Sequence, residues 1–444
     1  MIVRHSLIRL ALAVLLALVP ALAGCGGPVI TGAGDSDEIF DVDYTGVQPA
    51  SEISFWSNHP GGSIDTERAL VADFAKATGI RVNLVTAGAN YEEVSQKFQA
   101  AQTSRSVGDV VVVSDVTWFP AYLNRSIIPL EPVLAARGID TKGYRPALYD
   151  DYLYGGRHYA LPYSRSTPIF YYNAEHYRRA GLPDRPPSTW SEAADYGRRL
   201  KQGGVTVPSF GFPPQDQYVG WTMSNLVWGY GGGWSDKWDM NVVADSETRD
   251  AMEFARSGVT SGWATVTSGD PTTPFAAGAV SAVIASTGSL KDILEAATFD
   301  VGVGFLPGGP VDQDKVVPTG GAGLAIAAKS APDKQLAAAM FIAFMTNAKN
   351  TATFSAATGY LPVQTGADMD AVYAETPQFK IAVEQLAKAR SQDYARVFLP
   401  GGDRAISGTV QRILTTGASI DGALDTLRDD LENLYRRDVE PRLN

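Results

Sequence analysis

The sequence predicts an α/β protein built as two lobes, and three observations carry this prediction. Strand and helix patterns alternate between residues 53 and 113, as they do in a doubly wound sheet. About 420 residues would follow a cleaved leader, which is more than one hydrophobic core normally serves. The composition, 45% hydrophobic and 19% charged, is that of a folded globular chain.

The first 24 residues have the pattern of an export signal. Arg4 and Arg9 precede an uncharged run, Leu10 to Ala23, that is too short and too close to the terminus to favour a membrane-spanning helix. The run ends at Leu22-Ala23-Gly24-Cys25, which resembles the lipobox of bacterial lipoproteins, whose cysteine receives a diacylglycerol. The alternative is an ordinary signal peptide with an incidental cysteine.

Cys25 is the only cysteine in the sequence, so a lipid on it would leave no thiol for a disulfide. We therefore expect a signal peptide over residues 1–24 and a membrane anchor at Cys25. The stretch after it is rich in Gly and Asp and has no periodicity, so residues 25–49 are predicted to form a flexible tether.

Charge and residue usage exclude several classes of partner. The formal net charge is -11, becoming -13 without Arg4 and Arg9, and no basic tract could neutralise a row of phosphates. Nucleic acid is therefore not an expected partner. Four histidines without metal-type spacing and a single cysteine also predict no metal site, and nothing in the sequence calls for a cofactor.

The alternating pattern begins with a short strand at Ile53–Trp56. A helix over residues 63–78, a strand over 81–86 and a second helix capped by Asn90 with Glu93 follow it. Asp109 to Val113 (DVVVV) is then a continuous apolar run, typical of a parallel strand covered on both faces.

Two candidate ligand residues follow strands of this pattern. Ligands in open α/β sheets lie beyond the carboxyl ends of the strands, and Asp115 comes directly after one such strand. The alternative for Asp115 is a cap for a helix over residues 117–123. Tyr91 is the first helical residue after a strand-to-helix turn, and its alternative is a surface or staple aromatic.

The middle of the chain continues the α/β pattern. A hairpin over residues 155–160 precedes a β-rich run, Ser164 to Asn173, and a helix over 174–180. A T-x-x-E capping box at Thr189 starts the next helix. The densest aromatic stretch then predicts a wall facing a ligand, although each ring could equally be core: Tyr218, Trp221, Trp228, Tyr230, Trp234 and Trp238.

Later segments offer groups suited to a polar or anionic ligand. Residues 284–290 present Ser286 beside Gly288, and residues 318–326 form a predicted loop whose Gly320 and Gly321 would expose backbone N–H groups. Either segment could be only a turn. Tyr360 is predicted to lie in an exposed loop, residues 358–362.

Arg396 lies in a stretch, residues 393–396, that we predict to be nonhelical and to lie between two helices. A guanidinium there suits bidentate contact with a phosphate or carboxylate. A surface salt bridge is the alternative for Arg396.

The order of several motifs resembles a known family. They are FWSNHPG, NYEEVSQKF, LPYSRSTPIFYYN, PSTWSE, ASTGSL, PTGGAGLAI, TGYLPV and DYARVFLPGGDR. Together they resemble the solute-binding lipoproteins of glycerol-phosphate ABC importers, and more specifically their actinobacterial (mycobacterial) glycerophosphocholine-binding branch. LPYSRSTP and TGYLPV are shared more loosely with sugar-binding proteins, whereas TGGAGLAI with DYARVFLPGGDR is more specific.

The resemblance implies a two-lobe, periplasmic-binding-protein-like fold of the type II, maltose-binding-protein-like kind, with a hinge and a ligand cleft between the lobes. Lobe 1 would comprise residues 50–163 and 318–361, and lobe 2 residues 164–317 and 362–444. Crossings would fall near residues 163–166, 318–323 and 360–362.

The resemblance also implies ligand roles for eight positions: Tyr91, Asp115, Ser166, Trp221, Ser286, Gly321, Tyr360 and Arg396. Arg396, Ser286, Tyr360 and the Gly321 N–H would hold a phosphate, and Asp115 would accept from glycerol hydroxyls. Trp221 and Tyr218 would flank the alcohol substituent, where choline would favour ring faces. Tyr218 departs from the family, which has an aliphatic residue in the mycobacterial relative and tryptophan in the enteric ones. The choice between phosphomonoester and phosphodiester therefore stays open at this position, while the flanking motifs favour the diester.

These implications define the expected function and its competitors. The protein would be a monomer that delivers glycerophosphodiesters, glycerophosphocholine above all, or glycerol 3-phosphate to the membrane permease of an ABC importer with a cytoplasmic ATPase. A sugar-binding lipoprotein of the same fold is the alternative, and it would not need Arg396 in the cleft. A hydrolase is not expected, because the sequence has no G-x-S-x-G, Walker or H-E-x-x-H motif.

Overall fold

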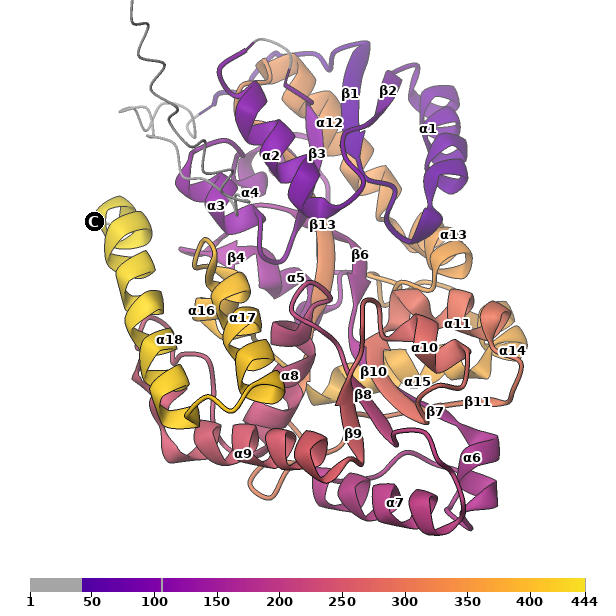
Figure 1. The fold of residues 1–444 in the computed structure, drawn as a ribbon. Helices are drawn as coiled ribbons and strands as arrows, with labels where there is room; N and C mark the ends of the chain where they lie inside the picture. Colours follow the sequence, from indigo (N-terminus) through magenta and orange to yellow (C-terminus); the bar gives the residue numbers. More distant parts are fainter. Residues whose placement is uncertain (1–41, 105–106, 444) are drawn as a thin grey trace, which may run out of the picture.

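The structure is a computed structural model that describes residues 42–104 and 107–443. Two five-stranded sheets form the centres of two lobes, one above the other in Figure 1. The predicted leader and Cys25 lie outside the described residues. Within those residues, no helix is long and apolar enough to cross a membrane.

Lobe 1 is built on a mixed sheet with the strand order β2-β1-β3-β13-β6. Its strands are β1 (Glu52–Ser57), β2 (Arg81–Thr86), β3 (Val110–Ser114), β6 (Leu161–Ser166) and β13 (Gly320–Ile326). The valine run of β3 is fully buried, as predicted, and lies parallel to β1. Its other neighbour, β13, is antiparallel, because that strand returns from lobe 2 late in the chain.

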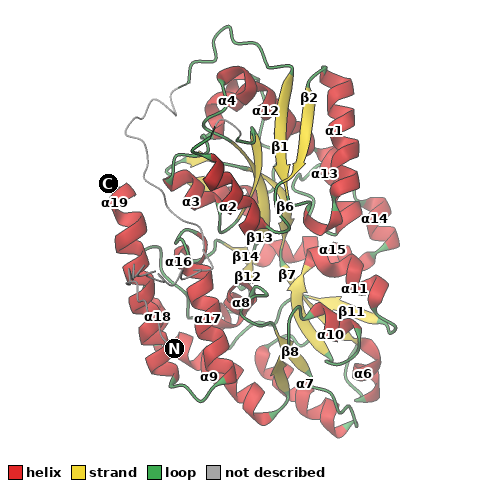
Figure 2. Ribbon diagram, turned by 45° about the horizontal axis from the view of Figure 1, so that its top comes forward, coloured by secondary structure: helices red, strands yellow, loops and turns green. Residues whose placement is uncertain are grey.

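Helices cover both faces of this sheet (Figure 2). They are α1 (Ile64–Thr78), α2 (Tyr91–Ala101), α3 (Trp118–Leu123), α4 (Leu130–Ala136), α5 (Pro146–Tyr149), α12 (Pro332–Met345) and α13 (Ala348–Thr358), with short turns η2 (Pro60–Gly62) and η3 (Asp150–Tyr152). The predicted cap of α2 is present, since Asn90 Oδ1 accepts from the Glu93 N–H at 2.9 Å. Glu93 in turn accepts from the Ala89 N–H at 2.8 Å, one residue before the predicted partner.

Lobe 2 is built on a second mixed sheet with the order β11-β7-β10-β8-β9. Its strands are β7 (Pro168–Asn173), β8 (Phe210–Phe212), β9 (Ala264–Val266), β10 (Ala282–Ser286) and β11 (Val301–Gly304). The surrounding helices are α6 (Ala174–Arg179), α7 (Trp190–Gln202), α8 (Val219–Gly229), η4 (Asn241–Ala244), α9 (Ser246–Ser261), α10 (Thr272–Ala276), η5 (Thr287–Ser289), α11 (Leu290–Ala296), α14 (Asp370–Glu375), α15 (Pro377–Gln385) and η6 (Leu386–Lys388).

The chain ends in helices that pack on lobe 2. These are α16 (Tyr394–Val397), α17 (Gly402–Thr415), α18 (Ile420–Leu434), the π-helical turn η7 (Tyr435–Val439) and α19 (Glu440–Leu443). Two small sheets complete the fold: the predicted hairpin of β4 (Leu153–Tyr154) with β5 (Arg157–His158), and β12 (Val317–Pro318) with β14 (Ala389–Arg390).

Strand pairing shows where the chain passes between the lobes. β6 ends in the first sheet at Ser166 and β7 begins in the second at Pro168, close to the predicted first crossing. The segment after Tyr360 stays on lobe 1 longer than predicted. The Val363 carbonyl accepts from the Arg145 N–H at 2.9 Å, and the Thr365 N–H donates to the Gly143 carbonyl at 2.9 Å.

The predicted tether also extends less far than expected. The Tyr44 hydroxyl donates to Gln335 Oε1 at 2.6 Å, and Val47 packs against buried side chains of lobe 1. Residues 44–47 therefore belong to the folded lobe, where Tyr44 contacts α12 and Val47 packs on the hydrophobic cluster.

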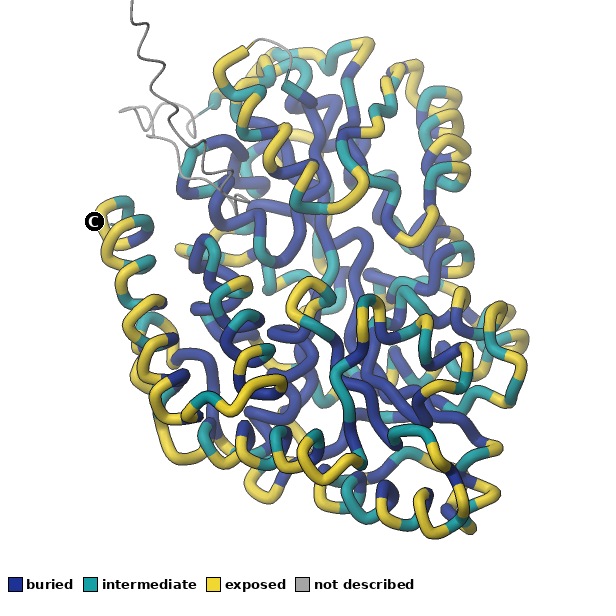
Figure 3. The backbone as a smooth tube through the Cα atoms, viewed as in Figure 1, coloured by how far each residue is buried: buried dark blue, intermediate teal, exposed yellow. Residues whose placement is uncertain are grey.

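The central strands of both lobes are buried, as the dark blue tube in Figure 3 shows, and their side chains alternate between two hydrophobic clusters. Val111 and Val113 of β3 point into one cluster, whereas Val110 and Val112 point into the other. The strands of lobe 2 alternate in the same way, so each cluster contains residues of both lobes. On one side an aromatic contact joins the lobes directly, as Phe119 of α3 stacks on Phe398 with ring centroids 4.6 Å apart.

Candidate functional site

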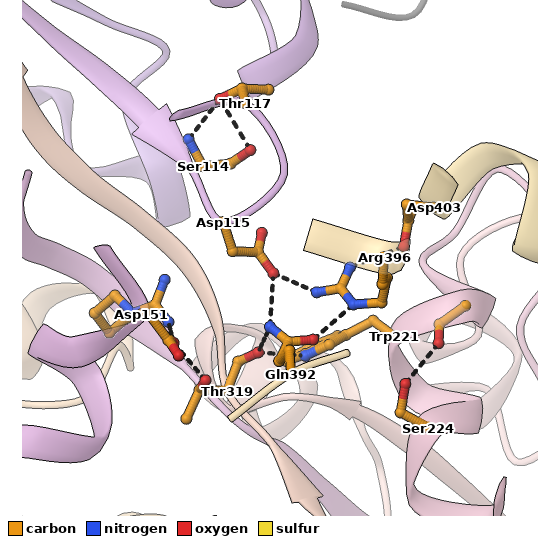
Figure 4. Close-up of polar contacts among 12 residues, drawn as sticks. Ser114, Asp115, Thr117, Asp151, Trp221, Ser224, Thr319, Gln392, Arg396 and Asp403 are labelled. Carbon is orange, nitrogen blue, oxygen red and sulfur yellow. Dashed lines mark hydrogen bonds and ion pairs between the residues drawn. The ribbon is translucent and has the colours of Figure 1, made fainter. Parts of the chain in front are cut away.

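Arg396 lies between the lobes, where it is held by three side chains (Figure 4). Arg396 is 4% exposed, and its Nη2 forms an ion pair with Asp115 Oδ2 of lobe 1. Nη1 donates to Asp403 Oδ1 at 2.8 Å, and Nε donates to Gln392 Oε1 at 2.6 Å. The guanidinium therefore bridges the two lobes and is not a surface salt bridge.

The local structure around Arg396 corrects the predicted nonhelical stretch. Residues 394–397 form one helical turn, α16, preceded by Asp393. The Asp393 carboxylate accepts from Trp228 Nε1 at 2.9 Å and from the Trp234 N–H at 2.8 Å. These tertiary contacts fix a turn that is too short to show a helical period in the sequence.

Gln392 connects the Arg396 cluster to the strand that crosses between the lobes. Its Nε2 donates to Asp115 Oδ2 at 3.1 Å and also to the Thr319 carbonyl. Trp221 Nε1 donates to the same carbonyl at 2.9 Å. One backbone oxygen between β12 and β13 thus orients both the amide of Gln392 and the indole of Trp221.

A second buried ion pair lies on the other side of Thr319. Asp151 pairs with Arg165 of β6, which is fully buried, and also accepts from the Thr319 hydroxyl. Arg165 Nη1 donates to the Tyr152 hydroxyl at 2.8 Å. Burial raises the pKa of the Asp151 carboxyl, an effect that the charge of Arg165 opposes. The network consequently runs from the cleft to β6, the strand of the first crossing.

Three hydroxyl-bearing residues predicted for the ligand converge beside this cluster. The Tyr91 hydroxyl lies 3.3 Å from the Tyr360 hydroxyl and 3.2 Å from Ser164 Oγ. A Cβ added at Gly288 would lie 3.1 Å from the Tyr360 ring, and Ser286 Oγ accepts from the Gly288 N–H at 3.1 Å. Tyr360, Tyr91 and the Ser286 turn therefore adjoin one another.

Both tyrosines keep their protons at neutral pH. Burial raises the pKa of Tyr91 well above its usual value, and the neighbouring Tyr360 adds to this effect. Burial likewise raises the pKa of Tyr360 to about 12. Each phenol can therefore donate a hydrogen bond to a ligand oxygen.

Tyr218 is the most exposed of the predicted ligand residues. It precedes α8 in a left-handed conformation (φ 61°), and it is 58% exposed. Desolvation, followed by the charges of Asp115 and Asp403, raises the pKa of its phenol. In contrast, Trp228 and Trp234 are core residues, so the aromatic wall is narrower than the sequence suggested.

Gly320 and Gly321 lie in a strand and not in the predicted loop. Gly320 of β13 pairs with the predicted ligand residue Ser166 of β6, and the Asp115 N–H donates to the Gly321 carbonyl at 2.9 Å. A Cβ on Gly320 would lie 2.8 Å from the Trp221 ring, and one on Gly321 would collide with the Ser164 carbonyl. Gly320 and Gly321 are required for close packing of β13 against its neighbours. In the sequence, glycines that serve this purpose look the same as glycines of a loop.

A cavity of about 630 Å³ opens beside Arg396. Glu92 and Val116 line it from lobe 1, and lobe 2 contributes the rest of its wall: Pro214, Gln215, Asp216, Arg396, Leu399, Gly401, Asp403, Arg404 and Gln411.

The alternative that Asp115 caps a helix is not observed, since Thr117 precedes α3.

Sequence reasoning did not identify Gln392, Asp403, Glu92, Asp216 or Arg404 as site residues. Asp403 and Arg404 stand within the quoted motif DYARVFLPGGDR and Glu92 within NYEEVSQKF, which was the available signal for these three. The others come together only through tertiary packing of distant segments. Among the described residues, no cluster of His, Cys, Asp and Glu could hold a metal ion.

A hollow between two α/β lobes, lined by polar side chains from both, defines a protein that captures a small solute. The model of the family described as bacterial extracellular solute-binding protein matches residues 69–381. The chain belongs to this family.

Two relatives with glycerophosphate ligands in their names are similar to the chain. UgpB from Mycobacterium tuberculosis, solved in complex with glycerophosphocholine, is 42% identical with a TM-score of 0.82, over 87% of this chain and 99% of that one. The sn-glycerol-3-phosphate-binding periplasmic protein UgpB of Pectobacterium atrosepticum is 27% identical over 78% of this chain and 82% of that protein.

More distant structures confirm the maltose-binding-protein-like fold. The GacH receptor of Streptomyces glaucescens, solved unliganded and with acarbose, is 21% identical with a TM-score of 0.75, over 87% of this chain and 99% of that one. T. maritima MalE3 with bound maltose, at 18% identity, has a TM-score of 0.68 over 87% of this chain and 100% of that one. At these identities the likeness concerns the fold alone.

Proposed function

We propose that the protein is the substrate-binding component of an ABC importer and captures glycerophosphodiesters, glycerophosphocholine above all, or sn-glycerol 3-phosphate. The 42% identity to a binding protein solved with glycerophosphocholine, over nearly its whole length, supports this ligand class. The similarity to sn-glycerol-3-phosphate-binding proteins supports the shared glycerophosphate part.

The observation that carries the proposal is a guanidinium enclosed between the lobes. Arg396 has five N–H donors, and its three protein acceptors take one each. Two N–H groups are left for a phosphate oxygen pair, the geometry that guanidinium groups bind well. The neighbouring phenols of Tyr91 and Tyr360 supply further donors.

The remaining ligand residues fit roles around this phosphate. Asp115 would accept from glycerol hydroxyls, and the Ser286 turn, Ser166 and the Gly321 backbone would contact the glycerophosphate. Trp221 and Tyr218 would face the alcohol substituent. Since Asp115 and Arg396 come from different lobes, a ligand that touches both favours the closed arrangement.

We also propose how the protein works in the cell. Cys25 would anchor it by lipid to the outer face of the cell membrane, and residues 26–43 would act as the tether. The lobes would be joined near residues 166–168, 318–320 and 362–370, and the closed monomer would dock on the permease. The protein would transfer its ligand unchanged, because its relatives are binding proteins and not enzymes.

Calorimetric titration of the purified protein with glycerophosphocholine, sn-glycerol 3-phosphate and trehalose tests the ligand class. We expect heat and saturation with at least one glycerophosphate and none with trehalose. Binding to trehalose alone would overturn the proposal in favour of a sugar-binding protein. Release of choline from glycerophosphocholine during the titration would contradict the transport role.

A further inference from the structure

The charges around Arg396 are unusual for a site that binds a phosphate. The guanidinium is flanked by two carboxylates, Asp115 and Asp403, so this cluster carries one net negative charge. The cavity wall adds Glu92, Asp216 and Arg404. The lining therefore has three carboxylates and two guanidinium groups, and Asp115, which pairs with Arg396 without lining the cavity, brings the formal net charge of this group to -2.

A phosphate bound to the remaining N–H groups of Arg396 must lie close to both carboxylates. Asp403 Oδ1 is 2.8 Å from Nη1, so a phosphate on the same guanidinium comes within about 5 to 6 Å of it. A phosphodiester carries one negative charge, whereas a phosphomonoester carries nearly two at neutral pH. The electrostatic repulsion between Asp403 and the phosphate is therefore almost twice as large for the monoester as for the diester.

We infer that Asp403 sets the charge that the cleft accepts, selecting phosphodiesters whose anionic phosphate is balanced by a cationic substituent and rejecting dianionic monoesters. The inference rests on the proposed function and names the substrate class within it. Glu92 and Asp216 also line the cavity, and their charges would attract the cationic substituent.

Asp403 is the better candidate for this selectivity than Asp115. Asp115 also accepts from Gln392 and is the group proposed to bind glycerol hydroxyls, which both ligands share. Asp403 has Arg396 as its hydrogen-bond partner and lines the cavity with a side chain that is 28% exposed. Burial raises the pKa of the Asp403 carboxyl despite the opposing charge of Arg396.

The test compares Asp403→Asn with the wild-type protein by calorimetric titration at pH 7.5 with glycerophosphocholine and sn-glycerol 3-phosphate. We expect the wild type to prefer glycerophosphocholine by at least about tenfold, and the variant to reduce this ratio by roughly ten- to a hundredfold, mainly through tighter monoester binding. Asp195→Asn on α7, which removes the same charge from an exposed ion pair, should leave the ratio unchanged.

A second variant covers the case in which Asp403→Asn does not fold. Asp216 is exposed, so Asp216→Asn leaves the core intact and should shift the ratio in the same direction by a smaller factor. An unchanged ratio in a folded Asp403→Asn protein that still binds glycerophosphocholine would overturn the inference alone. Equal binding of both ligands by the wild type would do the same. Failure of the wild type to bind either ligand would instead refute the proposed function.

Discussion

At the scale of single residues, the cleft depends on side chains that satisfy several partners at once. Gln392 is the clearest example, because its amide donates to Asp115 and to the Thr319 carbonyl while it accepts from Arg396. Only a neutral group with both donors and an acceptor can join a carboxylate, a carbonyl and a guanidinium in this way. A carboxylate at position 392 would instead repel Asp115.

Replacing Gln392 tests this positioning role. We expect Gln392→Ala to weaken glycerophosphocholine binding by about 2 kcal/mol, because the charged groups of Arg396 and Asp115 each lose a hydrogen bond with the Gln392 amide. Gln392→Glu should bind less tightly at pH 8 than at pH 5, since protonation restores a neutral group between the charges. Gln202→Ala, at an exposed end of α7, serves as the control in calorimetric titrations. Equal affinity at both pH values in Gln392→Glu would contradict the role.

At the scale of secondary-structure elements, the features predicted correctly are those set by residues adjacent in sequence, such as strands and helix caps. The valine run of β3 and the capping residues Asn90 and Thr189 lie where the sequence placed them, and the hairpin predicted for residues 155–160 forms two residues earlier, at 153–158. The one-turn helix α16 and the two-residue strands β12 and β14 were missed, because tertiary contacts define them and no periodic pattern accompanies them. Gly320 and Gly321 of β13 were predicted to lie in a loop, because only their pairing with β6 shows that they belong to a strand.

The start of α7 provides a stability prediction at this scale. Glu192 accepts from the Ser188 N–H at 2.6 Å and pairs with Arg185, whose hydrogen bond lowers the pKa of that carboxyl to about 2. Both side chains are partly exposed, so we expect Glu192→Ala to lower the free energy of unfolding by only about 1 kcal/mol at pH 7.

The pH dependence of this loss has a definite sign. A carboxyl whose pKa is lowered on folding stabilises the protein above its unfolded pKa, near 4.5, and this contribution disappears as the pH falls towards 2. Urea unfolding should therefore show a smaller difference between wild type and variant at pH 3 than at pH 7. The exposed change Glu253→Ala in α9 should give little difference at either pH. A larger loss at pH 3 would refute this explanation.

At the scale of the whole molecule, two lobes meet at the Arg396 cluster and share their buried interior. The predicted two-lobe, maltose-binding-protein-like fold is confirmed. Seven of the nine predicted ligand positions contact one of two groups, around Arg396 and around Tyr360. Of the other two, Ser166 pairs with Gly320 of β13, and Tyr218 is exposed before α8. Pairwise contacts such as Asp115 with Gln392 could not be predicted, because 277 residues separate them in sequence.

Closure of the lobes should be visible in solution. We expect glycerophosphocholine at a hundred times its Kd to raise the free energy of unfolding by about 2.7 kcal/mol and to reduce the radius of gyration. Thermal unfolding and small-angle X-ray scattering measure the two effects, with trehalose as the control solute. Saturating binding without any change in the radius would show that the lobes do not close on the ligand.

The most direct test of the account is glycerophosphocholine binding by Arg396 variants. Arg396→Leu should lose affinity by at least about a hundredfold, and Arg396→Lys should retain a small part of it, because lysine keeps the charge but not the paired donors. Arg198→Leu, from an exposed ion pair of α7, should bind as the wild type does. Undiminished binding by a folded Arg396→Leu protein would contradict the central claim that this guanidinium holds the phosphate between the lobes.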